Sequence, residues 1–210
     1  MTPMRPGFRE QKKQDMRDQL SLTTVLMARE RGLANVRVED IVDRVGVSRR
    51  TFSNYFASKE EAVADRHRQR AAQAARVLSQ RPPEEDLWQA VTAAVLQPYT
   101  AWSGARSPQP KEEQDSLLTA LSDPAMQTAI ARGSRLAAEE FAQAIAVRSG
   151  GDVNTDFYPR FIANAALSTA LVTLEFWLNA QPPIELLPLM EGAFHQLGQG
   201  LNHQTGSGTT

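Results

Sequence analysis

The sequence contains no cysteine among its 210 residues. This absence excludes disulfide bonds, thiolate metal ligands and cysteine nucleophiles, and it suits a reducing cytoplasm. Common active-site motifs are also missing: there is no Gly-x-Ser-x-Gly, no phosphate-binding glycine loop and no His-Glu-x-x-His. The three histidines are scattered, and Glu191 with His195 would supply two metal ligands, too few for a site. We therefore expect no enzyme, no metal site and no cofactor.

No stretch of the sequence is typical of a secretory signal or of a membrane span. The N-terminal MTPMRPGFREQKKQD has basic residues without an apolar core. The most apolar stretch, residues 161–178, is interrupted by polar side chains at Asn164, Ser168, Thr169, Thr173 and Glu175. We interpret this stretch as a buried helix and expect a cytoplasmic protein with no membrane partner.

The near-neutral net charge of −1 hides an uneven distribution. Residues 1–70 contain 15 Lys and Arg against 10 Asp and Glu, whereas residues 71–210 contain 8 against 14. A basic N-terminal part next to an acidic C-terminal part indicates a unit that faces a polyanion and a second unit with another task.

Apolar residues recur at spacings of three and four along almost the whole chain, and no run alternates at period two. The pattern predicts an all-α protein. The expected helices cover residues 9–31, 38–45, 49–55, 58–78, 84–103, 111–121, 124–149, 155–180 and 184–201. Pro98 lies inside one of them and should kink it, because proline lacks the backbone donor. Residues 104–110 are expected to form a loop.

The stretch VEDIVDRVGVSRRTFSNYF, residues 38–56, has the layout of a helix-turn-helix: two short helices joined by a tight turn at Gly46. Helical periodicity divides the second helix by face. Val47, Phe52 and Phe56 fall on the side that packs inward. The outward side chains are arginine, hydroxyl and amide types, which can pair with base edges and phosphates in a major groove: Arg49, Arg50, Ser53 and Asn54.

Three residues around this helix have predicted roles at its ends. Ser48 is expected to cap its N-terminus. Tyr55 places a phenol at its C-terminal end, and Lys59, in the first turn of the next helix, is expected to hold a phosphate. We therefore predict a DNA-binding unit in residues 1–57, a larger helical unit in 58–202 and a flexible tail in 203–210.

The N-terminal part of the sequence resembles a known family, the tetracycline-repressor (TetR) family of transcription regulators. The similarity covers residues 12–64, including RERGLANVRVEDIVDRVGVSRRTFSNYFASKEEAV. It implies a homodimer with an N-terminal three-helix DNA-binding domain, a connecting fourth helix and a C-terminal ligand-binding and dimerisation domain. By position, it implies groove or backbone contacts from Arg37, Val38, Ser48, Arg49, Arg50, Thr51, Ser53, Asn54, Tyr55 and Lys59.

The sequence departs from the family pattern at two positions. Ala28 stands where an aromatic residue is usual, so the core there is expected to be filled by Leu33 or Phe56. Arg37 replaces the usual Ser or Thr cap of the second helix; it can contact phosphate but cannot accept a capping hydrogen bond.

The C-terminal part predicts a pocket and a dimer interface. Aromatic and polar residues near the Pro98 kink suggest a largely apolar ligand with a few polar handles; the candidates are Trp88, Tyr99, Trp102, Met126, Phe141, Phe157, Phe161, Asn164 and Trp177. Two apolar helices could meet their symmetry mates as a four-helix interface, rather than serve a monomer core alone; the candidates are Leu167, Leu171, Leu174, Leu186, Met190, Phe194 and Leu197.

These patterns favour a ligand-responsive repressor that binds a palindromic double-stranded operator as a dimer and is released when a small, largely apolar effector shifts the fourth helix. One alternative is a DNA-binding protein of this fold that no small molecule gates, controlled by a protein partner or acting as an activator. Another is a helical carrier of apolar ligands.

Overall fold

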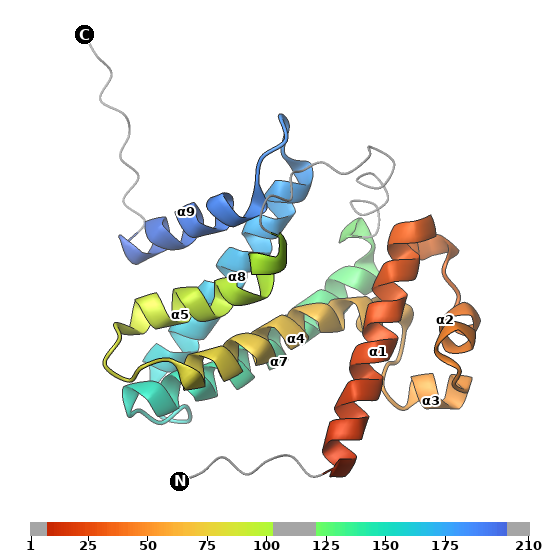
Figure 1. The fold of residues 1–210 in the computed structure, drawn as a ribbon, viewed down its shortest axis with the longest axis horizontal. Coiled ribbons are helices and arrows are strands. Elements are labelled where there is room, and N and C mark those ends of the chain that lie inside the picture. The colour runs from red at the N-terminus through yellow and green to blue at the C-terminus, as the bar shows by residue number, and fades with distance from the viewer. Residues whose placement is uncertain (1–7, 103–120, 201–210) are drawn as a thin grey trace. The chain divides into compact units, whose positions relative to one another are not determined.

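The computed structural model describes residues 8–102 and 121–200, and throughout these residues the regular structure is helical (Figure 1). The helices and two short 3-10 segments are α1 (Phe8–Arg31), η1 (Leu33–Asn35), α2 (Val38–Val45), α3 (Arg49–Ser53), α4 (Lys59–Gln80), α5 (Leu87–Leu96), η2 (Gln97–Trp102), α7 (Pro124–Ser149), α8 (Phe157–Asn179) and α9 (Leu186–Gly198). The expected all-α fold is confirmed.

Most helix ends lie within a few residues of their predicted positions, and the main difference is at Pro98. The single helix expected over 84–103 divides into α5 and the 3-10 segment η2. Proline lacks the amide that an α-helix needs there, so the backbone tightens rather than continuing. The predicted loop 104–110, most of the predicted helix 111–121 and the tail 203–210 lie outside the described residues.

The chain divides into two compact units. The first comprises residues 1–69 and 110–137, and the second comprises 70–109 and 138–210. The chain crosses between the units within α4 and within α7, because both helices continue past these limits.

The core of the first unit forms where α1, α2 and α3 meet (Figure 1). Phe52, near the end of α3, and Phe56, shortly after it, are almost completely buried with ring centroids 5.7 Å apart. The other buried members come from the preceding helices and the first turn of α4: Leu20, Met27, Val36, Ile41, Val42 and Ala62. Leu33, expected to compensate for Ala28, is also buried.

The core of the second unit forms among α5, η2, α8 and α9. Tyr99 and Trp177 pack there with Leu186 and Met190. At a neighbouring position the Trp88 ring stacks on Phe194 at 5.9 Å between centroids, and its indole N–H donates to the Phe194 carbonyl at 3.3 Å.

Helix α8 is buried on one face and exposed on the other, so the single chain covers only part of the helix that the sequence predicts to be buried. Phe157 and Phe161, placed in the pocket by the sequence, are 77% and 51% exposed and stack on each other. Asn164 is also exposed and donates to the Arg160 carbonyl. The same face continues through Val172 and Phe176. Apolar composition alone did not indicate which face of α8 would meet the core.

The predicted dimer residues lie mainly inside the chain. Leu186, Met190 and Phe194 of α9 are fully buried, and Leu167 of α8 is nearly so. Side chains that the chain itself buries cannot also face a partner, so these positions are corrected from interface to core. Leu171, Leu174 and Leu197 are half-buried.

Among the described residues, α8 has the length and apolar composition that could cross a membrane. One such helix is weak evidence of a span, since the core helix of a soluble protein passes the same test.

Candidate DNA-binding surface

The turn between α2 and α3 depends on Gly46. Its φ of 79° lies in the left-handed region, where a residue without a side chain is under no steric strain. The Gly46 and Val47 amides both donate to the Val42 carbonyl, at 2.8 and 2.9 Å, which closes the end of α2. The turn thus sets the angle at which α3 leaves α2, as in a helix-turn-helix.

The start of α3 is capped as predicted. The Ser48 hydroxyl accepts from the Thr51 amide at 3.0 Å, and the Ser48 and Thr51 hydroxyls lie 2.9 Å apart. A helix of five residues has little stability of its own, so the cap and the buried Phe52 hold it in place. Both hydroxyls are already used locally, although Ser48 remains exposed.

The opposite face of α3 is open to solvent. Arg49, Arg50, Ser53 and Asn54 are all exposed, while Phe52 between them is buried. Arg49 forms an ion pair at 2.9 Å with Glu39 of α2, and both side chains are well exposed. An exposed pair of this kind is worth little, so Arg49 can exchange Glu39 for a phosphate or a base edge.

The N-terminus of α2 is organised by Asp40. Its carboxylate accepts from the Arg37 amide at 3.1 Å and from the Arg31 guanidinium at 2.5 Å. The backbone hydrogen bond from Arg37, aided by Arg31, holds the pKa of the Asp40 carboxyl below its usual range. Asp40 therefore performs the capping that Arg37 cannot, and the Arg37 side chain is left exposed. Val38 is half-buried against the core.

Lys59 has a structural role that the sequence did not reveal. Its ammonium donates to the carbonyls of Leu33 at 2.7 Å and Val36 at 2.9 Å, and lies 3.5 Å from that of Ala34. Lys59 therefore holds the end of η1 through these hydrogen bonds, and we assign it this structural role in place of the predicted phosphate contact. The first turn of α4 is capped separately, by the Ser58 hydroxyl accepting from the Glu61 amide at 3.2 Å.

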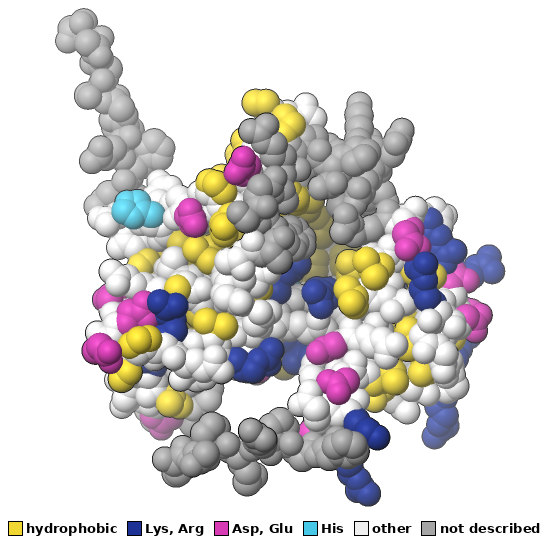
Figure 2. All heavy atoms as spheres, in the orientation of Figure 1, with side chains coloured by type: hydrophobic (Ala, Val, Ile, Leu, Met, Phe, Trp, Pro, Cys, Tyr) yellow, Lys and Arg dark blue, Asp and Glu magenta, His cyan; other side chains and the backbone are white. Residues whose placement is uncertain are grey.

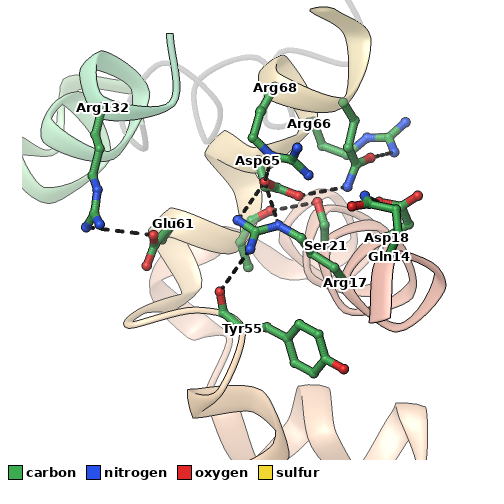
Figure 3. Close-up of polar contacts among 12 residues, drawn as sticks. Gln14, Arg17, Asp18, Ser21, Tyr55, Glu61, Asp65, Arg66, Arg68 and Arg132 are labelled. Carbon is green, nitrogen blue, oxygen red and sulfur yellow. Dashed lines mark hydrogen bonds and ion pairs between the residues drawn. The ribbon is translucent and has the colours of Figure 1, made fainter. Parts of the chain in front are cut away.

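A buried ionic network joins α1, the end of α3 and α4 (Figure 3). Asp65 of α4 accepts from the Arg17 guanidinium at 2.9 and 3.0 Å, from Arg68 at 2.7 Å and from Gln69 at 2.9 Å. Arg17 also donates to the Tyr55 carbonyl at 3.4 Å and lies over the Phe56 ring. Sequence reasoning missed this network, because residues 17 and 65 carry no local pattern that pairs them.

The charge balance of this network determines the state of Asp65. Its side chain is 1% exposed, and burial alone would raise the pKa of its carboxyl. Hydrogen bonds and charge from Arg17 and Arg68 outweigh burial, so the pKa is lowered and Asp65 is ionised at neutral pH. The ion pair between Arg17 of α1 and Asp65 of α4 therefore connects both helices to the Tyr55 carbonyl at the end of α3.

Helix α4 is also held by the N-terminal part of α7 within the first unit. Arg132 lies 3.9 Å from the Glu61 carboxylate (Figure 3). Gly133 of α7 lies beside α4, since a Cβ added there would make an ordinary van der Waals contact with the Ala64 carbonyl at 3.6 Å. The first turns of α4 thus contact α1 on one side and α7 on another.

The predicted pocket residues are only partly brought together. Tyr99 and Trp177 share one core, where the Trp177 indole donates to the Ile184 carbonyl at 3.0 Å. Burial raises the pKa of the Tyr99 phenol, which the nearby Arg70 partly offsets. Phe141 and Met126 are each buried. The side chain of Trp102 lies outside the described part of the structure. Within that part, no three His, Asp or Glu residues group as metal ligands.

A capped, core-anchored helix that presents arginine, hydroxyl and amide groups after a glycine turn defines a helix-turn-helix DNA-binding regulator. Residues 23–64 match the family model for bacterial regulatory proteins of the tetR family, and residues 85–202 match the model for the MftR C-terminal domain. The chain belongs to the tetR family of transcriptional regulators, which are DNA-binding proteins rather than enzymes.

Two curated relatives support the same assignment. The HTH-type transcriptional regulator TcmR of Streptomyces glaucescens is 31% identical over 197 residues, covering 89% of this chain and 84% of its own length. A protein named as a mycofactocin biosynthesis transcriptional regulator, MftR, of Mycobacterium tuberculosis is 29% identical over 171 residues. The match covers 81% of this chain and 83% of the relative's own length. The similarity extends over both the DNA-binding and the C-terminal regions.

Proposed function

We propose that this protein is a ligand-responsive repressor that binds a palindromic operator as a homodimer in the cytoplasm. The observation that carries the proposal is the outward face of α3, where Arg49, Arg50, Ser53 and Asn54 are exposed around the buried Phe52. These side chains supply the donors and acceptors that read base edges in a major groove. Arg37 and the phenol of Tyr55 are assigned to the flanking phosphates.

The proposed effector is small and largely apolar. Support comes from the apolar interior of the second unit, where two aromatic residues with polar tips, Tyr99 and Trp177, pack with aliphatic side chains. Such a composition is typical of sites that bind apolar ligands with a few polar handles. The MftR-type C-terminal domain spans this part of the chain. We keep the division at residues 57 and 58 as the proposed boundary between DNA-binding and effector domains.

The proposed dimer contact is the exposed face of α8, in place of the buried leucines predicted from the sequence. Phe157, Phe161, Val172 and Phe176 are exposed on this face beside the polar Ser168 and Glu175, and large exposed apolar side chains gathered on one face mark an interaction site. Two heads held about 34–36 Å apart would read successive major grooves of a palindrome. An effector that alters this spacing would release the DNA.

Fluorescence anisotropy on labelled DNA from upstream of the protein's own gene tests DNA recognition. We expect Arg50→Ala to weaken specific binding by about 1–3 kcal/mol, or roughly 5- to 150-fold. Arg76→Ala removes another exposed arginine, from α4, and serves as the matched control. Equal affinities for wild type and Arg50→Ala would show that this face of α3 does not read the operator.

Gating is tested on the same complex with two probes that join a large apolar part to charged groups, oleoyl-CoA and anthraquinone-2-carboxylate. Release of the operator by either probe, at concentrations that leave the fold intact by circular dichroism, supports a ligand-gated repressor. Specific operator binding that neither probe changes favours the ungated alternative, in which a protein partner controls the regulator.

A further inference from the structure

Helix α1 begins far in advance of the matched family region. It starts at Phe8, whereas the tetR-family model matches from residue 23. More than half of this 24-residue helix therefore precedes the matched segment. The match to this model therefore assigns no role to the first turns of α1.

The first turns of α1 extend past the rest of the DNA-binding unit. Arg9, Glu10, Gln11, Lys12 and Lys13 are all exposed, whereas Met16 and Arg17 are half-buried and Leu20 is fully buried. Figure 1 shows this end of α1 reaching beyond α3 and beyond the turn that leads to α4. We name residues 8–13 the α1 arm.

One face of the arm is basic and lies on the same side of α1 as Arg17, which belongs to the ionic network. Arg9, Lys13 and Arg17 are spaced by four, which places them on one side of a helix. Arg17 is where this side meets the network, contacting the Tyr55 carbonyl and Asp65. Lys13 and Arg9 lie about 6 and 12 Å farther along the helix axis. The cations thus lead away from the end of the recognition helix.

The acidic residues of α1 leave this face largely uncompensated. Asp15 accepts from Gln11 at 2.8 Å and Asp18 from Gln14 at 2.6 Å, and both aspartates lie on the other flank of the helix. Glu10 is the one carboxylate close to the basic side. Figure 2 shows Lys and Arg side chains at this free end of α1 and beside α3.

We propose that the α1 arm binds DNA phosphates that flank the segment read by α3, through Arg9 and Lys13. Arg9 and Lys13 are exposed on the side of α1 whose Arg17 contacts the end of α3, so they are available to the phosphates of a duplex longer than the segment that α3 reads. Lysine and arginine contact phosphates without regard to sequence, so the arm would add affinity and salt dependence rather than specificity. The inference rests on the proposed operator binding.

The test is the salt dependence of operator binding by the double variant Arg9→Gln/Lys13→Gln. Each phosphate contact contributes about 0.9 to the slope of log K against log salt, so we expect the slope to fall by about 1.8 for each head. For one head, lowering the salt from 200 to 50 mM should therefore raise the affinity of the double variant about 12-fold less than it raises that of the wild type. The ratio of specific to non-specific affinity should stay unchanged.

Two further variants control for charge and for folding. The swap Arg9→Lys/Lys13→Arg keeps both charges and should keep the wild-type slope. Arg76→Gln/Arg160→Gln removes two exposed charges from the second unit and should also keep the wild-type slope. Helix content and the thermal midpoint of each variant are compared by circular dichroism.

The outcomes separate the two proposals. Wild-type protein that binds no operator would overturn the proposed function. The proposed role of the arm would be overturned if the double variant bound the operator with the wild-type slope. An equal fall of the slope in the Arg76/Arg160 control would overturn it as well. If the double variant lost binding to anionic phosphatidylserine vesicles while its DNA slope stayed unchanged, the phosphate contact to DNA would also be overturned and the arm would be assigned to a lipid surface.

Discussion

Asp65 is a charged residue inside the first unit, and the network around it explains how the charge is tolerated. An isolated buried carboxylate is costly, but this one accepts from Arg17, Arg68 and Gln69. The same Arg17 guanidinium reaches the backbone at Tyr55, where α3 ends. Any change at Asp65 therefore acts on fold stability and on the placement of α3 together.

Asp65→Asn is expected to lower the free energy of unfolding by about 3 kcal/mol, because it leaves the Arg17 and Arg68 guanidinium groups without their buried counter-charge. Urea denaturation followed by circular dichroism measures the change. Asp15→Asn, at an exposed position of α1, is the control and should stay within about 0.5 kcal/mol. Equal stability of both variants would mean that the network does not hold α1 to α4.

The same residue predicts a dependence on pH. The pKa of Asp65 is lower in the folded protein than in the unfolded chain, so its contribution is complete above the ordinary aspartate value of about 3.9. It is lost as the pH falls through the lower folded value. We expect wild-type stability to decline more steeply than that of Asp65→Asn below about pH 4. Parallel declines in urea titrations at stepped pH would contradict this.

At the scale of single elements, α3 shows how a very short helix is held in place. Gly46 turns the chain, Ser48 caps the first turn and Phe52 anchors the inner face. Five residues cannot sustain a helix alone, so each of these supports matters for the position of the exposed side chains of α3.

Gly46→Ala is expected to cost about 1–2 kcal/mol of stability, because its φ of 79° is unfavourable for a residue with a Cβ. Nothing lies within 4 Å of the added Cβ, so the cost is conformational and not a clash. Gly46→Asn adds a larger side chain but tolerates this region better, so it should cost less. Thermal midpoints of the two variants test the order, and a more stable alanine variant would contradict it.

At the scale of the whole molecule, the exposed face of α8 is an apolar surface that the described part of the chain leaves uncovered. It carries large apolar residues at both ends of the helix, with Phe157 and Phe161 stacked at one end and Phe176 60% exposed near the other. The proposed homodimer would bury this face, and it would also link two DNA-binding heads.

Phe176→Glu is expected to convert the proposed dimer to a monomer, because it places a charge within an apolar contact. Operator affinity should then fall at least 100-fold, since the two heads no longer bind as one unit. Light scattering after size exclusion and anisotropy measure the two effects. Val147→Glu, at a 74% exposed position of α7, is the matched control. A Phe176→Glu variant that remains dimeric would assign the contact to another surface.

Several features of this protein followed from local sequence pattern. Spacings of three and four predicted the helices, and the order of Gly46, Ser48 and Phe52 predicted the turn, the cap and the inner face of α3. These are short-range properties, because backbone conformation and capping depend on residues within a few positions of one another.

Other features were decided only by tertiary structure, because they depend on residues far apart in the chain. The pairing of Arg17 with Asp65 and the use of Lys59 to hold η1 require contacts across 48 and 26 positions. Likewise, α8 is apolar on more than one face, and only its packing against α5 and α9 decides that Leu167 turns inward and Phe176 outward. The sequence by itself therefore determined the helices and the outward face of α3, whereas tertiary packing decided which apolar and charged groups remain available to a partner.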